Sequence, residues 1–563
     1  MGDTTYDAVV VGAGPNGLVA ANHLVDAGWS VLLLEAQPDA GGAVRSANDV
    51  HQDYVHDTFS SFYPLALASP VIGHLHLEDH GLRWQHAPAV LGHRTPDGRW
   101  ALLHRDRTVT AAIVDELHPG DGEAWLDLCA AWDKIGDDLV GSLMTPFPPV
   151  RHGTALLARL RSVGGLDFAR LLLTPAADVG RQLFGGVGPR LLIAGNAAHA
   201  DIPLDATGSG LMGILMTMLG QTVGFPVPEG GAGELAGAMA RRFTSLGGEL
   251  RTSVEVTSIE VSSGRAVAVR TAGGERFAAR RAVLADVLAS RLYGGLVDVE
   301  DLPGRTVKAM RGFQLDPGTV KVDWALDGPV PWSTPPPYAP GTVHVADSVT
   351  ELAEASGQIA AGAIPANPFL LVGQMTTSDP TRSPTGTEAL WAYTHVPQRV
   401  GYDAGDDGLQ GTWDHDERER FANRMQARLE RLAPGFGDRI RARRVLGPHE
   451  LQARDANLEG GAINGGTSAL HQQLVFRPTP GTGRSETPIE RLYLASASAH
   501  PGGGVHGGPG ANAARAALRA GTTGRLALAA TRALVGRPPD GPRTAAGEDP
   551  GPTVDHASKV ARS

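Results

Sequence analysis

The first 35 residues alternate between continuous apolar runs and a segment with helical spacing. Residues 7–12 form a run rich in β-branched side chains that ends in glycine, which is typical of a buried parallel strand. Residues 16–27 place Leu18, Ala21 and Leu24 at helical spacing, and Gly28 follows as a stop signal. Residues 30–35 form a second apolar run. The pattern therefore predicts a β-α-β unit.

Beyond this unit the period of the pattern changes twice. Helical spacing predicts helices at 106–141, 155–173, 177–183, 234–246 and 417–431, and an apolar, methionine-rich segment lies at 208–220. Alternation with period two predicts short strands at 250–256, 258–261, 266–271, 275–279, 282–284, 319–326, 370–375 and 389–394. A strand at 492–495, a helix at 511–528 broken near Gly521, and a disordered tail from 538 complete the prediction. This mixture indicates an α/β protein.

A glycine-rich motif opens the first predicted helix. Its six residues are Gly12, Ala13, Gly14, Pro15, Asn16 and Gly17. The motif follows a predicted strand, which is the context that marks a dinucleotide-binding loop. Gly12 permits the tight turn, Gly14 leaves room for a diphosphate, and Gly17 lets helix and strand pack closely. The free N–H groups of the helix N-terminus would then bind the phosphates.

The residues after the second strand indicate which dinucleotide binds. Glu35, followed by Ala36, ends that strand, and a carboxylate there accepts hydrogen bonds from ribose hydroxyls and repels a 2′-phosphate. Gly41, Gly42 and Arg45 form a GGxxR extension in which the guanidinium can approach the diphosphate or the flavin edge. This extension resembles that of flavin amine oxidases and carotenoid desaturases, and nicotinamide dehydrogenases usually lack it, so the resemblance favours FAD.

A second glycine-rich loop lies near the other end of the sequence. Residues 496–510 contain six glycines between a predicted strand and a predicted helix. Such a loop suits backbone that must lie against a flat ring, and the following helix N-terminus would point at the flavin N1–C2=O edge. We predict Ser498, Gly503, Gly504 and Val505 as cofactor contacts. His500 and His506 are candidate catalytic proton carriers, with a structural hydrogen-bonding role as the alternative.

Together these motifs resemble those of the phytoene desaturase-like FAD oxidoreductases, in particular bacterial relatives of pyridine nucleotide-disulfide oxidoreductase domain-containing protein 2. The resemblance rests on the segments 6–45, 54–70, 195–201, 220–231, 460–466 and 492–510. It implies a flavin amine oxidase-like architecture, with backbone contact to the adenosine at Val256 and passage of Thr58 and Ser60 close to the isoalloxazine ring. One departure is that 496–499 carries Ser-Ala-Ser-Ala where carotenoid desaturases usually have an acidic residue or threonine.

The resemblance also implies two lobes, each built from separate segments. A Rossmann-like FAD-binding domain would comprise 1–105, 233–300 and 446–537, an α+β substrate domain would comprise 106–232 and 301–445, and the tail 538–563 would lie outside both.

Composition removes several other classes. A net charge of −11 disfavours nucleic-acid binding, and the single cysteine, Cys129, excludes an intrachain disulfide or CxxC site. No convergent metal-ligand set can be read from the sequence. No apolar run reaches the length of about 20 residues that spans a bilayer, and no signal peptide is evident. We expect a cytoplasmic protein, with membrane association at most peripheral.

These observations predict an oxidoreductase that transfers a hydride from a hydrophobic small molecule, of polyene or isoprenoid type, to flavin N5. Met212, Met216 and Met218 would suit an irregular apolar ligand if their segment lines a channel, and plain core is the alternative. Oxygen or a quinone is the expected electron acceptor, because no second dinucleotide motif is found. An amine-oxidising flavoenzyme and a regulatory flavoprotein that acts through a partner remain alternatives. The oligomeric state is left open.

Overall fold

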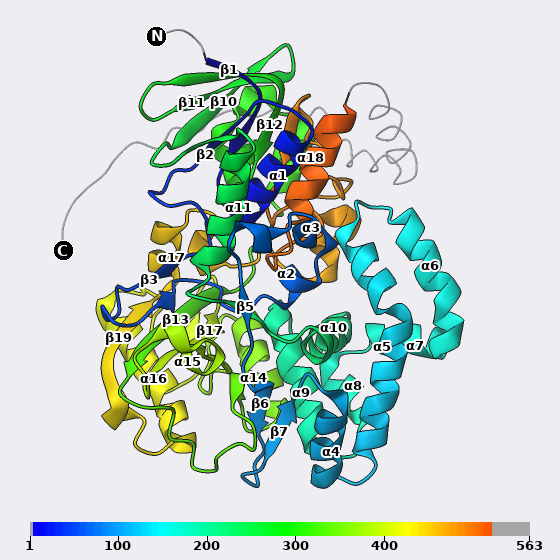
Figure 1. Ribbon diagram of the computed structural model, residues 1–563, viewed down its shortest axis with the longest axis vertical. Coiled ribbons are helices and arrows are strands. Elements are labelled where there is room, and N and C mark those ends of the chain that lie inside the picture. The colour runs from blue at the N-terminus through cyan, green and yellow to red at the C-terminus, as the bar shows by residue number, and fades with distance from the viewer. Residues whose placement is uncertain (1–3, 521–563) are drawn as a thin grey trace, which may run out of the picture.

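The computed structural model describes residues 4–520. Two seven-stranded sheets, three two-stranded sheets and a group of helices form the described part of the chain. In Figure 1 the first sheet lies at the top, the second sheet at the lower left, and helices α4 to α10 at the lower right.

The first sheet takes strands from distant parts of the chain. Its order is β10-β11-β12-β1-β2-β9, and β20 also pairs with β12. The pairs β12–β1, β1–β2, β2–β9 and β12–β20 are parallel, whereas β10, β11 and β12 form an antiparallel meander. The strands are β1 (Thr4–Val11), β2 (Val31–Leu34), β9 (Glu249–Arg251), β10 (Val256–Ser262), β11 (Arg265–Thr271), β12 (Arg276–Ala285) and β20 (Leu492–Leu494).

Successive side chains of β1 point to opposite faces of this sheet, and both faces are covered by other elements. Ala8 and Val10 belong to a core that includes α1 (Pro15–Asp26), α11 (Gly233–Ser245) and α18 (Gly508–Arg519). Val9 and Val11 belong to a second core on the opposite face. Because both faces are buried, the strand reads as a continuous apolar run in the sequence.

The second sheet has the order β19-β13-β17-β16-β14-β6-β7 and is antiparallel except at the β14–β6 pair. Helix α16 (His415–Leu432) packs its apolar stripe, which includes Phe421 and Met425, against it. The strands are β6 (Ala89–Arg94), β7 (Trp100–Leu103), β13 (Gly318–Leu326), β14 (Pro340–Val345), β16 (Leu370–Gln374), β17 (Glu388–Val396) and β19 (Ile440–Leu446).

The helical group packs against β6 and β7 at one edge of the second sheet. Helices α9 and α10 are mostly buried within it and pack against each other. The helices are α4 (Arg107–Leu117), α5 (Asp121–Met144), α6 (Val150–Leu160), α7 (Leu166–Leu173), α8 (Ala176–Leu183), α9 (Val187–Ala197) and α10 (Ser209–Thr222). Shorter elements that matter below are β4 (His56–Asp57), α2 (Pro64–Ala68), η3 (Ala198–Ala200), α14 (Val349–Ala360) and α17 (Pro448–Arg454).

The α/β class and the flavin amine oxidase-like architecture are confirmed, and the structure refines several boundaries. The segment predicted as one strand at 250–256 is two strands, because the chain leaves the sheet between Arg251 and Val256. Strands β6 and β7 belong to the second sheet. The domain prediction instead assigns residues 89–103 to the FAD-binding domain, which contains the first sheet. The other domain boundaries stay a prediction. The C-terminal helix begins earlier than predicted, at Gly508, and the break near Gly521 and the tail lie outside the described residues.

Candidate active site

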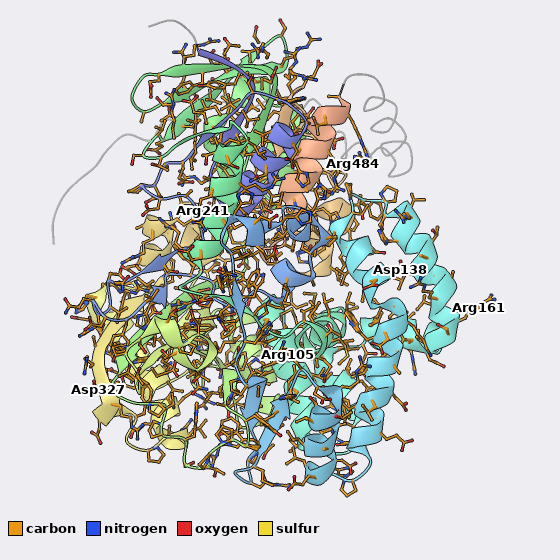
Figure 2. The ribbon with its side chains drawn as sticks, in the orientation of Figure 1. Arg105, Asp138, Arg161, Arg241, Asp327 and Arg484 are labelled. Carbon is orange, nitrogen blue, oxygen red and sulfur yellow. The ribbon has the colours of Figure 1, made fainter. Side chains whose placement is uncertain are left out.

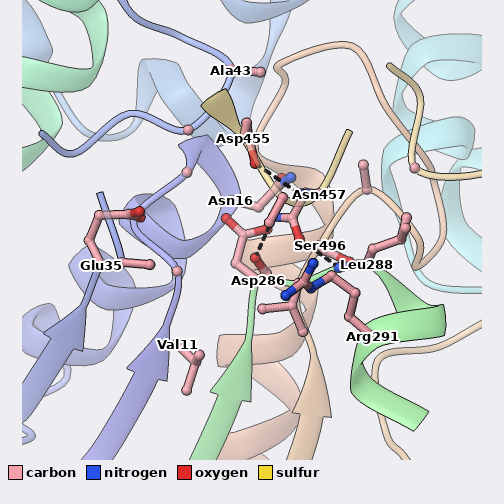
Figure 3. A pocket seen from close by; sticks show the side chains of 18 of the residues that line it. Val11, Asn16, Glu35, Ala43, Asp286, Leu288, Arg291, Asp455, Asn457 and Ser496 are labelled. Atoms are coloured by element: carbon pink, nitrogen blue, oxygen red, sulfur yellow. Dashed lines mark hydrogen bonds between the residues drawn. The ribbon is translucent and has the colours of Figure 1, made fainter. Parts of the chain in front are cut away.

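A cavity lies at the carboxyl ends of the parallel strands β1, β2 and β12, where dinucleotides bind in open α/β sheets. Gly12, Gly14, Pro15 and Asn16 form one wall of it (Figure 3). Gly12 has φ +92°, a conformation that suits glycine. A Cβ on Gly17 would lie 2.0 Å from the Gly12 carbonyl oxygen. The loop therefore requires glycine at these positions, as the motif predicts.

Glu35 stands beside this loop at the end of β2, with Ala36 next to it in the cavity wall. Its Oε2 accepts a hydrogen bond from the Ala13 backbone N–H at 2.8 Å, and its Oε1 accepts one from Gln37 at 2.9 Å. Burial raises the pKa of the Glu35 carboxyl, and these two backbone bonds oppose the rise. Each carboxylate oxygen keeps a lone pair for a ribose hydroxyl. Val256, the first residue of β10, lines the same cavity.

Asp286 follows β12 directly and was not found from the sequence. Its Oδ2 accepts a hydrogen bond from the Gly17 N–H at 2.8 Å, so the carboxyl caps the N-terminus of α1. A Cβ on Gly14 would lie 2.8 Å from the same oxygen. Burial, with smaller contributions from Asp455 and Glu35, raises the pKa of Asp286 to about 8. A single aspartate after a strand carries no sequence signal of its own.

The opposite wall comes from the segment after α17 and was also missed. Asn457 donates through Nδ2 to the Asp286 carbonyl at 3.0 Å and accepts from the Leu288 N–H at 2.9 Å (Figure 3). Asp455 and Arg291 line the cavity as well. Burial raises the pKa of Asp455. These residues join three distant parts of the chain around one cavity.

The GGxxR extension lies against the glycine loop. Gly41 donates its N–H to the Ala13 carbonyl at 2.8 Å, and Gly42 lines the cavity. Arg45 donates to the carbonyls of Gly42 at 2.9 Å and Arg454 at 2.5 Å, and its guanidinium lies 5.4 Å from the Phe59 ring centroid. Arg45 therefore holds backbone segments together and is not among the cavity-lining residues.

A second cavity of about 280 Å³ adjoins the first and shares Ala43, Leu458 and Ile463 with it. Its wall is largely apolar and includes Phe62, Met212, Met216, Phe225, Leu371 and Trp391. Met218, in contrast, is fully buried in the core. The methionine-rich helix α10 thus has both of the roles considered for it, because one face lines the cavity and the rest is core.

Aromatic and basic side chains from neighbouring strands also line the second cavity. Trp391 and Tyr393 of β17 stack with ring centroids 5.8 Å apart. Lys321 of β13 lies over the Trp391 ring at 5.7 Å, donates to the Asp57 carbonyl at 2.9 Å and forms an ion pair with Asp323. Burial lowers the pKa of the Lys321 ammonium, against the opposing effect of Asp323.

The C-terminal glycine loop meets both cavities. Gly503, Gly504 and Val505 line the second cavity, and Ser498 lines the first. The Ser498 hydroxyl donates to the Gly465 carbonyl at 2.8 Å and accepts from the Ala289 N–H at 3.0 Å. Ser60 also lines the second cavity, and the Thr58 N–H donates to the Arg45 carbonyl at 2.9 Å.

His500 and His506 lie in this loop but outside the cavity linings. His506 contacts the Gly503 carbonyl through Nε2 at 3.1 Å and accepts from the Gly508 N–H through Nδ1 at 3.0 Å. His500 contacts the Thr145 carbonyl through Nε2 at 3.0 Å. Burial lowers the pKa of His506 to about 4. The catalytic role stays a prediction, and the geometry favours a structural role for both rings.

Two further motifs of the sequence meet behind the second cavity. Asp201, from the motif at 195–201, pairs with His395 and accepts from the amide of Asn464, which belongs to the motif at 460–466. Asp316 accepts from the N–H groups of Ile463 at 2.6 Å and Asn464 at 2.9 Å. The motifs therefore converge in space on one wall. Among residues 4–520, no group of three or more His, Cys, Asp or Glu side chains is arranged to hold a metal ion.

Comparisons with known proteins agree with this geometry. A sequence model described as flavin containing amine oxidoreductase matches residues 16–289. An oxidoreductase from Methanosarcina mazei superimposes with a TM-score of 0.58 at 15% identity over 91% of this chain and 99% of its own. Putrescine oxidase bound to putrescine gives 0.57 at 17% identity over 92% and 99%. The glycine cradle, Glu35 and the adjoining cavity fit FAD, so fold and site define an FAD-dependent oxidoreductase of flavin amine oxidase-like architecture.

Several curated proteins are similar over about nine tenths of the chain. Pyridine nucleotide-disulfide oxidoreductase domain-containing protein 2 of Rattus norvegicus is 28% identical over 556 residues, which cover 91% of this chain and 93% of its own. Phytoene desaturase (neurosporene-forming) of Rhodobacter capsulatus is 25% identical over 518 residues, which cover 88% and 91%. That this chain is a bacterial relative of pyridine nucleotide-disulfide oxidoreductase domain-containing protein 2 stays a prediction.

Proposed function

We propose that the protein oxidises a hydrophobic small molecule, of polyene or isoprenoid type, by hydride transfer to flavin N5. The observation that carries this proposal is the apolar second cavity, which adjoins the dinucleotide cavity and shares the lining residues Ala43, Leu458 and Ile463 with it. FAD, when bound, supplies a two-electron acceptor. Oxygen or a quinone is the proposed final acceptor, and a phytoene desaturase is one of the similar proteins.

In this proposal the residues of the first cavity hold the nucleotide. Glu35 accepts from the ribose hydroxyls, and the free N–H groups at the start of α1 bind the diphosphate. The segments carrying Thr58, Ser60 and Val505 border the flavin ring. The full set proposed to contact the cofactor is Gly12, Ala13, Gly14, Pro15, Asn16, Gly17, Glu35, Ala36, Gly41, Gly42, Arg45, Thr58, Ser60, Val256, Ser498, Gly503, Gly504 and Val505.

The side chains of the second cavity would position the substrate and exclude water from it. Met212 and Met216 adapt to irregular apolar shapes, and Trp391 offers a flat apolar surface. A dry cavity protects a reactive C–H centre from competing reactions with solvent.

An anaerobic titration tests the proposal. The FAD-loaded protein is mixed with polyenes, isoprenoid alcohols and amines in the absence of oxygen, and the loss of the oxidised flavin band is followed. We expect at least one apolar compound to bleach the flavin. Met216→Glu should block that bleaching, because it places a charge in the apolar wall. Met310→Glu serves as the matched control, because Met310 lies on α13 (Gly304–Met310) and does not line the cavity.

Amine oxidation is the second candidate, and one observation favours it. Trp391 and Tyr393 form a stacked aromatic pair in the cavity wall, as an amine-oxidising site would need. Bleaching by amines alone would select this candidate. A flavin that stays oxidised with every compound would contradict both candidates and favour a regulatory flavoprotein.

We also propose peripheral contact with an anionic membrane surface through α6 and α7. Leu157 and Leu166 are 68% and 87% exposed there, far above the usual exposure of leucine. Arg151 on α6 and Arg161, which directly follows that helix, are also exposed, and Figure 2 shows Arg161 at the outer edge of the molecule. Apolar and basic side chains on adjacent helices suit an interface of acyl chains and anionic headgroups. No helix among residues 4–520 is long and apolar enough to span a bilayer.

Vesicle flotation tests this surface. Vesicles of phosphatidylcholine with phosphatidylglycerol should carry the wild-type protein upward, and Leu157→Ser with Leu166→Ser should abolish flotation. Leu246→Ser with Val299→Ser removes two exposed apolar side chains elsewhere and should leave flotation unchanged. Equal flotation of both double variants would contradict the assignment of α6 and α7.

A further inference from the structure

Three histidines from separate elements lie at or next to the second cavity, and two of them, His93 and His344, are buried. His344 of β14 and His93 of β6 are register partners in the second sheet, with ring centroids 6.0 Å apart. His199 of η3 lines the cavity itself, and its Nε2 lies 2.8 Å from the Nε2 of His344. This contact joins the cavity wall to the sheet behind it.

The contact between His199 and His344 requires one ring to donate and the other to accept. Burial lowers the pKa of His199 to about 3, with a smaller contribution from His395, and burial also lowers the pKa of His344 well below its ordinary value. Both rings are therefore neutral near pH 7 and carry one proton each. Only two arrangements of these protons satisfy the contact.

The surroundings of His344 decide between the two arrangements. Its Nδ1 is buried and has no hydrogen-bond partner among the described residues. It faces Gly195, where a Cβ would lie 2.2 Å from this nitrogen. A proton on Nδ1 would be a buried donor without an acceptor, which costs about 1–3 kcal/mol, and orphaned N–H groups are rarer than orphaned acceptors. The proton of His344 therefore belongs on Nε2, from which it is donated to His199.

The protonation of His199 follows from this. Because its Nε2 accepts, its own proton lies on Nδ1. No described residue forms a hydrogen bond with Nδ1, and this atom is not among the fully buried unpaired atoms. Since His199 is half-buried and lines the cavity, the free N–H is available to a molecule inside it.

We propose that the His199 Nδ1–H donates a hydrogen bond to an oxygen atom of the substrate. The substrate class is then a hydrophobic molecule that carries a hydroxyl or carbonyl oxygen. A pure hydrocarbon leaves the donor unpaired, and an alkylammonium brings a second donor and a positive charge near the Lys321 ammonium, which lines the same cavity. This inference rests on the proposed function, because it takes the second cavity as the substrate site.

Nitrogen NMR of protein labelled with ¹⁵N-histidine tests the protonation directly. Histidine tautomers have distinct ¹⁵N shifts and ring couplings, and the His199 signals are assigned by their loss in His199→Phe. We expect His199 as the neutral Nδ1–H tautomer and His344 as the neutral Nε2–H tautomer. An Nε2–H tautomer or a charged ring for His199 near pH 7 would overturn the proposal. The measurement needs no turnover, so failure to bleach the flavin does not affect it.

Ligand binding tests the substrate class. Farnesol, farnesene and farnesylamine share one isoprenoid skeleton, and their dissociation constants are measured on the FAD-loaded protein from changes in tryptophan fluorescence. We expect farnesol to bind about tenfold more tightly than the other two, the effect of one net hydrogen bond. His199→Phe should reduce this ratio to about 1, and His199→Gln, which keeps an N–H donor, should restore part of it. Equal binding of farnesol and farnesene, or an unchanged ratio in His199→Phe, would refute the assignment.

Discussion

Single carboxyl groups give the first cavity its electrostatic character. Glu35, Asp286 and Asp455 line it together, and burial raises the pKa of each. A neutral Asp286 is compatible with a nearby diphosphate, whereas a charged one repels it. In the proposed cofactor site, a protonated Asp286 would therefore avoid charge repulsion with the diphosphate that the glycine loop and Glu35 are proposed to hold.

Asp286→Asn should raise stability in a way that depends on pH. The wild-type carboxyl keeps its proton up to pH about 8 in the folded state but loses it near its ordinary value of 3.8 in the unfolded chain. The folded state therefore binds more protons between these values, and it loses stability as pH rises through them. Asparagine removes this loss and still accepts from Gly17. We expect on the order of 2–3 kcal/mol of added unfolding free energy at pH 8 and little at pH 4.

Urea unfolding at the two pH values measures this difference. Asp39→Asn, at an exposed carboxylate, is the matched control and should change stability little at either pH. A pH-independent effect of Asp286→Asn would contradict the raised pKa.

Among the elements, helices α1 and α18 lie in close contact. Helix α18 packs beside α1 on the first sheet, although about 500 residues separate them (Figure 1). The closest point is Gly510, where a Cβ would lie 2.0 Å from the Asn16 carbonyl oxygen. The absence of a side chain at this position sets the distance between both helix N-termini.

Gly510→Ala should therefore separate the helices and weaken FAD binding. The new methyl group meets backbone atoms, which cannot move aside as a side chain would, so we expect a loss of about 2–3 kcal/mol in unfolding free energy. Gly357→Ala, in the exposed part of α14 with open space around it, should instead stabilise by about 0.5–1 kcal/mol. Thermal unfolding and FAD dissociation constants of both variants measure these effects. Similar behaviour of the two would rule out close packing at Gly510.

At the scale of the whole molecule, a buried ion-pair network joins two separate segments of the chain. One is the segment after the GGxxR extension, and the other directly precedes β17 of the second sheet. Arg382, which is 0% exposed, donates to Asp57 at 3.0 Å and to Asp379 at 2.9 Å. Asp57 also accepts from the Ala232 N–H at 2.7 Å. Although burial acts to raise it, the pKa of Asp57 is lowered by Arg382. The network holds in place the chain that carries Thr58 and Ser60 past the cavities.

Arg382→Met should destabilise the protein by about 3–5 kcal/mol, because it leaves buried carboxylates without their partner. Arg107→Met removes a surface ion pair with Asp133 whose side chains are 38% and 50% exposed, and it should cost less than about 1 kcal/mol. Denaturant unfolding of both variants compares the two pairs. An equally small effect at Arg382 would mean that its carboxylates become protonated or hydrated without loss.

The parts of this molecule that local sequence determines were predictable, and the parts that distant contacts determine were not. Gly12, Gly17 and Glu35 lie within one β-α-β unit, so spacing alone indicates their roles. Asp286 and Asn457 reach the same cavity from separate segments, and neither residue type is unusual in its local context. Helix α9 was not predicted because it is apolar on nearly all sides, which leaves no amphipathic pattern. The pairing of His199 with His344 likewise depends on the tertiary fold.

The position of β20 and α18 in the first sheet has a consequence for biosynthesis. The strand that pairs with β12 and the helix that closes on Asn16 emerge from the ribosome only after residue 519 has been made. At about 20 residues per second, roughly 12 seconds pass between the synthesis of β12 and that of α18, during which this edge of β12 stays uncovered. Nascent chains should therefore depend on chaperones until release, and a ribosome stalled at codon 480 should carry a polypeptide that retains no yellow colour.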